Sequence, residues 1–166
     1  MSGGVVVRRA RTSDVRAMKA LIDQYAGKVL LSKPLVTLYE DVQEFWVAEQ
    51  DGELFGCGAL HVLWEDLAEI RSVAVSPVSL GNGIGHQVVA RLIEVARELE
   101  LRRIFVLTFE TRFFGKHGFV EIEGTPVSSE VYEEIMRSVD EGVAEFLDLS
   151  YVKPNTLGNS RMLLEL

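Results

Sequence analysis

The sequence predicts an α/β domain built on a mixed sheet, with helices on both faces. Three observations support this class. The chain has 166 residues, about the length of one domain. Short β-type runs and stretches with helical spacing share the chain, but three strands follow one another before the longest helix, unlike a strictly alternating βαβ protein. No linker, internal repeat or low-complexity tract interrupts residues 1–166, so we expect one domain.

The first half of the chain predicts four strands and one helix. The strands are short apolar runs at 5–9, 44–49, 54–63 and 69–75. An Asp51-Gly52 pair between the second and third runs is a strong hairpin signal. The helix begins at Thr12 or Ser13, ends at Gly27, and carries apolar residues at intervals of three and four: Val15, Met18, Ile22 and Tyr25. Residues 28–43 read as irregular or weakly helical.

The second half predicts the longest helix and a nearly all-apolar strand. The helix covers about 84–99 and has one apolar stripe: Val88, Val89, Leu92, Ile93, Ala96 and Leu99. The strand over 104–108 has the composition of a strand buried on both faces. The elements expected after it are a helix over 111–116, a strand over 119–121, a helix from Ser128 or Ser129 with Val131, Ile135 and Val139 on one face, a segment over 145–152, and a last strand over 162–166.

Charge and residue usage argue against several functional classes. The formal net charge of −8 repels phosphate backbones, so we expect no nucleic-acid partner. Cys57, the one cysteine, and three scattered histidines form no recognisable metal or disulfide pattern, and we read Cys57 as a buried strand residue. No run approaches the ~18 apolar residues of a membrane span. We therefore expect a cytoplasmic protein without metal or membrane contact; its oligomeric state, a homodimer included, stays open.

A glycine-rich loop connects the fourth strand to the longest helix. Gly81, Gly83 and Gly85 allow positive φ and a close backbone approach, and the unpaired N–H groups of the first helical turn attract anions. A P-loop would end in Gly-Lys-Ser/Thr, whereas this loop ends in Gly-His-Gln. A dinucleotide fold would place the glycines after its first strand. The loop therefore predicts anion binding of another kind.

Three segments with the expected order and spacing resemble the GNAT superfamily of N-acetyltransferases. They are Ala74-Val75-Ser76-Pro77, Leu80-Gly81-Asn82-Gly83-Ile84-Gly85, and Phe113-Phe114-Gly115-Lys116-His117-Gly118-Phe119. The resemblance implies the GNAT fold, with a mixed, mostly antiparallel sheet of six to seven strands. It also implies acetyl-CoA as cosubstrate, with the pyrophosphate on backbone N–H groups from Asn82 to Gly85 and the pantetheine along the strand edge at Val73 and Val75.

The cofactor-binding residues that the resemblance implies include two departures from the family pattern. The set is Val73, Ala74, Val75, Leu80, Gly81, Asn82, Gly83, Ile84, Gly85 and Phe114. Leu80 replaces the usual Arg or Gln, which removes a phosphate-directed side chain but leaves the backbone groups. Phe114 replaces the tyrosine that in many members protonates the departing thiolate. Tyr151 or a water could supply that proton instead.

The C-terminal segment resembles the amino-acid acetyltransferases that make N-acetylglutamate. The similarity covers Asn155 to Leu163, with further agreement over 69–75 and 104–108. The whole chain resembles a short bacterial form of this family without the amino-acid-kinase domain. The resemblance implies acetyl transfer to the α-amine of L-glutamate or L-glutamine, the first step of arginine biosynthesis.

A dicarboxylic acceptor needs cations inside an acidic protein. Arg71 and Arg161 are separately placed guanidiniums that could clamp two carboxylates. The other candidate acceptor-binding residues are Thr108, Arg112, Asn159 and Ser160. Glu69 and Glu110, at strand ends, are candidates for the general base that takes the ammonium proton.

Two other interpretations stay open. One is a GNAT enzyme for another acceptor, such as a polyamine, an antibiotic or a protein N-terminus. The other is a non-catalytic acetyl-CoA-binding sensor, which Phe114 and Leu80 motivate.

Overall fold

The computed structural model describes residues 4–25, 33–148 and 159–166, and seven strands in these ranges form one sheet. They are β1 (Val6–Arg9), β2 (Phe45–Gln50), β3 (Glu53–Trp64), β4 (Leu67–Val75), β5 (Arg103–Thr108), β6 (Val120–Glu121) and β7 (Ser160–Glu165). The spatial order is β1-β2-β3-β4-β5-β7-β6. Neighbours are antiparallel except β4 and β5, which are parallel. The predicted mixed, mostly antiparallel sheet is confirmed.

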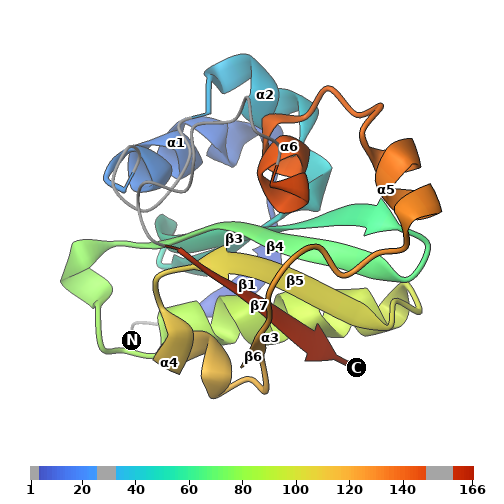
Figure 1. Cartoon of the computed structure of the whole chain (residues 1–166). Coiled ribbons are helices and arrows are strands. Elements are labelled where there is room, and N and C mark those ends of the chain that lie inside the picture. The colour runs from blue at the N-terminus through green and yellow to red at the C-terminus, as the bar shows by residue number, and fades with distance from the viewer. Residues whose placement is uncertain (1–3, 26–32, 149–158) are drawn as a thin grey trace.

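Helices cover both faces of this sheet (Figure 1). They are α1 (Val15–Asp23), α2 (Leu35–Glu40), α3 (Ile84–Glu98), α4 (Thr111–Gly115), α5 (Ser129–Ile135) and α6 (Glu141–Leu147). Figure 1 shows α1, α2, α5 and α6 above the sheet and α3 and α4 below it. Short 3-10 turns precede α1, β2 and α3 at Thr12–Asp14, Val42–Glu44 and Pro77–Ser79. No helix in the described ranges is long and apolar enough to cross a membrane.

Three apolar clusters hold the helices to the sheet. The largest lies under α3, where Val88, Val89 and Leu92 are fully buried against the strands, as the apolar stripe predicts. A second lies under α1 and includes Met18. The third lies under α5 and α6, where Phe146 meets the ring of Phe105 edge-on at 4.9 Å. Burial of these faces is the main force that fixes the helices on the sheet.

Several local predictions need correction. Leu99 follows the end of α3 and is 54% exposed, so it does not extend the stripe. Val139 is fully exposed, because α5 ends at Ile135 and a separate helix begins after Asp140, whose carboxylate accepts the Val143 N–H. Residues 145–147 of the expected closing segment form the last turn of α6. Gly27, the expected end of the first helix, lies outside the described residues; α1 itself ends at Asp23.

The Asp51-Gly52 hairpin is confirmed. Asp51 and Gly52 have φ of 52° and 81°, and they join β2 to β3. Two consecutive positive φ values match the twist of the flanking strands. The hairpin sets the first two pairs, Gln50 with Glu53 and Glu49 with Leu54, and the register then shifts between Glu49 and Ala48.

β4 contains a bulge. The register between β3 and β4 shifts between Cys57 and Ala59, so that Gly58 alone opposes Ser72 and Val73. Ser72 has φ of 56°, which is uncommon for a residue with a side chain. A Cβ on Gly58 would lie 2.9 Å from a side-chain carbon of α3, so glycine lets that helix pack closely here. The bulge redirects the backbone of β4.

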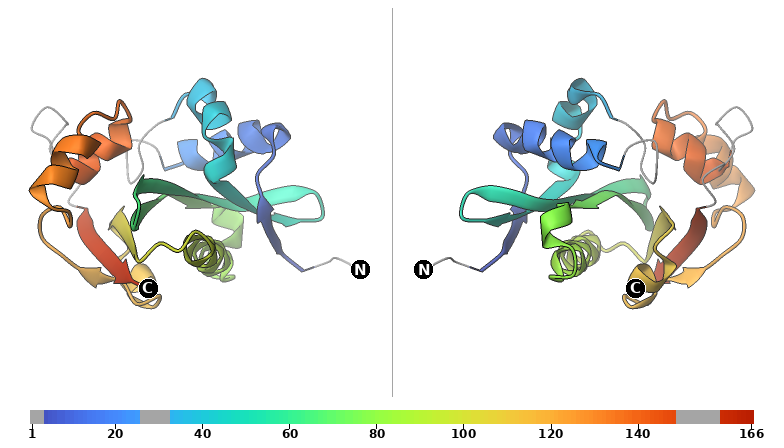
Figure 2. Two further views of the ribbon diagram at one scale, coloured as in Figure 1. Left: turned by 90° about the vertical axis from the view of Figure 1, so that its right-hand side faces the viewer. Right: turned by 90° about the vertical axis from the view of Figure 1, so that its left-hand side faces the viewer.

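Beyond the bulge, β4 and β5 separate. They pair only over Leu67–Ile70 and Arg103–Val106, although both strands continue further. Figure 2 shows the two halves of the molecule, joined along these strands, diverging from one another. The ends of β4 and β5 therefore present unpaired backbone groups to the space between them, at the point where α3 begins.

Candidate active site

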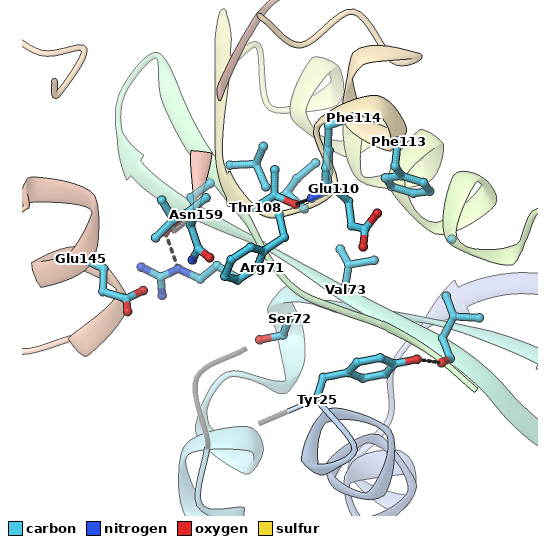
Figure 3. Close-up of a pocket in the computed structure, with 18 of the residues that line it drawn as sticks. Tyr25, Arg71, Ser72, Val73, Thr108, Glu110, Phe113, Phe114, Glu145 and Asn159 are labelled. Carbon is cyan, nitrogen blue, oxygen red and sulfur yellow. Dashed lines mark hydrogen bonds and ion pairs between the residues drawn. The ribbon is translucent and has the colours of Figure 1, made fainter. Parts of the chain in front are cut away.

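A cavity of about 380 Å³ lies between the separated ends of β4 and β5 (Figure 3). Residues from α4 and α6 also line it, as does Tyr25, which follows α1. The sequence-predicted residues in its lining are Glu69, Arg71, Val73, Val75, Leu80, Gly85, Thr108, Glu110, Phe114 and Asn159. The structure thus brings together residues predicted for the cofactor, the acceptor and the proton transfer.

Other predicted residues lie outside this lining. Ala74, Gly81, Asn82, Gly83, Ile84, Arg112, Ser160 and Arg161 are near it in sequence but do not line it. Tyr151, a candidate proton donor, lies outside the described residues. Sequence reasoning missed other lining residues, among them Tyr25, Lys33, Gly142 and Glu145. Each is distant in sequence from the motifs, and their neighbours carry no pattern that would mark them.

The N-terminus of α3 offers a built anion site. Gly83 has φ of 77° at the N-cap and no side chain caps the helix. The Gln87 N–H is the first to bond within the turn, to the Gly83 carbonyl at 3.1 Å, which leaves the N–H groups of Ile84, Gly85 and His86 without helical acceptors. The first turn holds no acidic residue. These groups fit a pyrophosphate, as the motif predicts.

One detail of the predicted cradle changes. The Asn82 N–H donates to the Ser79 carbonyl at 3.2 Å, so it closes a turn and does not point freely to a ligand. The donors for an anion therefore begin at Gly83. Leu80 is 64% exposed and adds no polar group to the loop, so its side chain offers no donor to a phosphate.

On the open edge of β4, the Val75 carbonyl already accepts a hydrogen bond. The Tyr25 hydroxyl donates to the Val75 carbonyl oxygen at 2.6 Å, and Figure 3 shows its ring below this strand. A pantetheine on this edge would meet Tyr25 at Val75. The helical spacing of Tyr25 with Ile22 suggested only a core residue.

Aromatic rings from α4 close the other side of the cavity. Phe114 is 4% exposed and contacts Phe113 and Phe119 edge-on, with centroid distances of 5.0 and 5.3 Å. A Cβ on Gly85 would lie 3.2 Å from the Phe113 ring, so glycine lets the start of α3 approach α4. Phe114 supplies an apolar wall and has no proton to donate to a thiolate.

At the other end, Arg71 is enclosed by carboxylates. Its Nε donates to Glu69 Oε1 at 2.6 Å and its Nη1 lies 2.8 Å from Asp140 Oδ1. Its side chain is 8% exposed. Among the described residues its Nη2 is buried without a hydrogen-bond partner. Such an atom is the donor that a bound carboxylate or carbonyl oxygen would satisfy.

The two carboxylates titrate in opposite directions. Burial raises the pKa of Glu69 above its ordinary value, and the neighbouring Arg71 only partly opposes this. Burial also disfavours ionisation of Asp140, but the charge of Arg71 and the Val143 N–H outweigh it and hold the pKa of Asp140 below its ordinary value. Glu69 is therefore the carboxylate closer to the range of a general base at neutral pH.

Arg161 does not share this end of the cavity. Its guanidinium donates to the carbonyls of Gly124, Glu145 and Phe146, and its Cζ lies 4.9 Å above the Phe105 ring. These contacts tie β7 to the segment before α5 and to the last turn of α6. The guanidinium of Arg161 is thus engaged by carbonyl groups of the chain itself, and the two-arginine clamp stays a prediction.

The remaining candidates differ in position. Arg112 is exposed, and Ser160 pairs with Thr108 in the register of β5 and β7. The Thr108 hydroxyl accepts the Glu110 N–H at 2.8 Å, which fixes the end of β5 where Glu110 reaches the cavity.

Cys57 is fully buried, which raises the pKa of its thiol to about 12 and makes it a poor nucleophile. No metal-ligating group of His, Cys, Asp and Glu occurs within residues 4–25, 33–148 and 159–166.

The split between β4 and β5, the uncapped helix start and the apolar wall match the arrangement expected of a site for an acyl-CoA thioester. The family model described as "Acetyltransferase (GNAT) family" matches residues 15–119, and the chain belongs to this family. The predicted fold, enzyme class and acetyl-CoA cosubstrate are thereby confirmed.

Two similar proteins match nearly the whole chain. A curated amino-acid acetyltransferase from Mycobacterium tuberculosis is 71% identical over 164 residues, covering 97% of this chain and 94% of the relative. A crystal structure from the same organism, in complex with CoA and the ligand NLQ, has a TM-score of 0.95 and 71% identity, and covers 97% of this chain and 99% of the other.

The N-acetylglutamate synthase of Neisseria gonorrhoeae, complexed with coenzyme A and N-acetyl-glutamate, is a longer neighbour. It has a TM-score of 0.78 and 25% identity. The match covers 99% of this chain but 35% of that one, so this chain spans about a third of that enzyme.

Proposed function

We propose that the chain transfers acetyl from acetyl-CoA to the α-amine of L-glutamate, or of L-glutamine, as the first step of arginine biosynthesis in the cytoplasm. Two relatives support an amino-acid acceptor. The M. tuberculosis relative is named an amino-acid acetyltransferase, and the N. gonorrhoeae neighbour was solved with N-acetyl-glutamate. An acetyltransferase for polyamines would have the same cofactor end. Only the acceptor end of the cavity can therefore distinguish an amino acid from a polyamine.

Arg71 is the observation that carries the proposal. It lines the cavity, is almost fully buried, and has one guanidinium nitrogen without an acceptor among the described residues. A buried donor of this kind favours an acceptor that brings an oxygen, as amino acids do. A cationic amine would leave this donor unsatisfied. Lys33 also lines the cavity and adds a second cation at the same end.

The proposed reaction assigns the steps to residues at the two ends of the cavity. The N–H groups at the start of α3 hold the phosphates, which fixes the thioester beside the bulge of β4. Glu69, with Glu110 as the exposed alternative, takes the ammonium proton, and the free amine attacks the thioester carbonyl. A backbone N–H at Val73 stabilises the developing oxyanion. The C–S bond then breaks, and a water protonates the thiolate because Phe114 has no hydroxyl.

A thiol-release assay tests the acceptor class. Acetyl-CoA is incubated with the protein and, in turn, each of the common amino acids, spermidine and a short peptide with a free N-terminus. We expect release of CoA thiol with L-glutamate or L-glutamine, an N-acetyl product of the matching mass, and background release with spermidine. A rate that does not depend on any amino acid would contradict the proposal, and saturable turnover with spermidine or the peptide would replace it with another acceptor.

A further inference from the structure

Helix α6 reaches the acceptor end of the cavity through Asp140 and Gly142. Asp140 caps the helix, since its Oδ1 accepts the Val143 N–H at 3.1 Å. The same atom lies 2.8 Å from Arg71 Nη1. Figure 3 shows the Arg71 guanidinium extending toward Glu145, which also belongs to this helix. α6 lies beyond residues 15–119, so the family match does not include it.

Gly142 forms the surface against which the guanidinium packs. A Cβ built on Gly142 would lie 2.6 Å from Arg71 Cζ, 2.7 Å from Nη2 and 3.0 Å from Nε. These distances are shorter than van der Waals contact, so a side chain here and the present position of Arg71 exclude one another. Gly142 has no positive φ, so the backbone conformation does not require glycine. Glycine is required here because Arg71 lies so close.

These contacts fix the guanidinium on three sides. Glu69 holds Nε, Asp140 holds Nη1, and Gly142 packs against the group itself. Nη2 is the buried nitrogen that keeps no partner in the described part of the chain. A planar guanidinium fixed in this way aims its remaining donor in a set direction, which is what recognition of a single oxygen needs.

We propose that Asp140 and Gly142 are positioning residues of the acceptor site, and that they hold Arg71 so that Nη2 donates to an oxygen of the acceptor. The class of acceptor rests on the function proposed above. α6 is then a wall of the site that controls where the acceptor oxygen can lie. A merely structural role for α6 would leave the binding of the acceptor unchanged as long as the fold is intact.

Gly142→Ala is the first test. The Cβ would meet the far end of a flexible side chain, so we expect the guanidinium to move and the fold to remain. The KM for the amino acid should rise about tenfold or more, which is the loss expected for one hydrogen bond to a charged group. The KM for acetyl-CoA should change less than about twofold. Gly115→Ala in α4 is the matched control, because a Cβ there has no neighbour within 4 Å.

Asp140→Ser and Asp140→Asn separate capping from positioning. Serine and asparagine both cap helices well, so α6 should persist in both variants. Serine is shorter and loses the contact with Arg71 Nη1. We therefore expect the amino-acid KM of Asp140→Ser to rise about as much as that of Gly142→Ala. Asparagine keeps a neutral oxygen for Nη1 and should restore part of the affinity. Equal effects on the KM values of both substrates, or a normal KM for Asp140→Ser with a normal melting temperature, would overturn the proposal.

A readout without acceptor distinguishes this inference from the proposed function. The Nε–Hε resonance of Arg71, assigned in 15N-labelled protein by its loss in Arg71→Lys, reports the guanidinium that bonds Glu69. We expect it to shift in Gly142→Ala and in Asp140→Ser but not in Gly115→Ala. An unmoved resonance overturns the positioning role, and a moved resonance with an unchanged amino-acid KM overturns the acceptor role of Arg71. If wild-type protein shows no amino-acid dependence, the proposed function fails, and the resonance still decides the positioning.

Discussion

Replacing Gly83 by valine tests the anion site at the start of α3. Gly83 has φ of 77°, where a β-branched residue costs about 1–2 kcal/mol. For a chain of this length that corresponds to a fall in melting temperature of roughly 2–8 °C. Straining the N-cap also displaces the N–H groups of Ile84 and Gly85 from a phosphate. Losing two charge-assisted hydrogen bonds at about 1.5–3 kcal/mol each should weaken CoA binding more than about 100-fold.

Gly52→Val is the matched control for this prediction. Gly52 has φ of 81° and, like Gly83, a Cβ there would have no neighbour within 4 Å. The strain is therefore similar, but Gly52 lies in the β2–β3 hairpin. Titration calorimetry with CoA and a thermal melt of both variants give the answer. Similar melting temperatures with very different CoA affinities are expected; equal CoA affinities would refute the assignment of the phosphates to this backbone.

Three further variants test the base, the second arginine and the acid stability. Glu69→Gln should lower kcat about 100-fold or more. It should also remove the fall in rate that we expect of the wild type as pH drops through the raised pKa of Glu69; a retained acid limb would assign the proton transfer elsewhere. Arg161→Ala should lower the melting temperature while changing the amino-acid KM less than Arg71→Ala does; the reverse order would restore Arg161 as a ligand. The ion pair with Arg8 lowers the pKa of Asp14 from its ordinary value of 3.8. Its contribution to stability is therefore present above that value and is lost as pH falls through the folded pKa. In urea unfolding, Asp14→Asn should lose less free energy of unfolding than wild type between pH 7 and acid pH, and an identical pH dependence would contradict this.

The sequence predicted the parts of the fold that depend on local patterns. The stripe of α3 and the Asp51-Gly52 hairpin are determined by neighbouring residues, and both are confirmed. α2 and α6 have six and seven residues, too short for a 3.6-residue period to emerge. α6 depends on the cap at Asp140 and on Phe146 packing against Phe105, and the latter contact joins residues distant in sequence.

The candidate site divides in the same way. The residues proposed to hold the cofactor are contiguous with the motifs, so their spacing was informative. The acceptor end is assembled from β4, α6 and Lys33, and only the fold brings them together. Arg71 and Arg161 looked equivalent as isolated cations in the sequence. The structure distinguishes them because Arg71 keeps a buried donor, whereas the Arg161 contacts are carbonyl groups of the chain itself.

The net charge of −8 opposes acetyl-CoA and an anionic acceptor such as the proposed L-glutamate, so the site must overcome it locally. Exposed charges farther than about 8 Å are largely screened at physiological ionic strength. Within that range, the first turn of α3 presents oriented N–H groups and no acidic residue, which favours phosphate. At the other end, Glu69 and Asp140 surround Arg71; burial raises the pKa of Glu69, whereas Arg71 and the Val143 N–H hold the pKa of Asp140 down. The Nη2 atom of Arg71, buried without a partner among the described residues, is then the donor left at this end for an oxygen of the proposed acceptor.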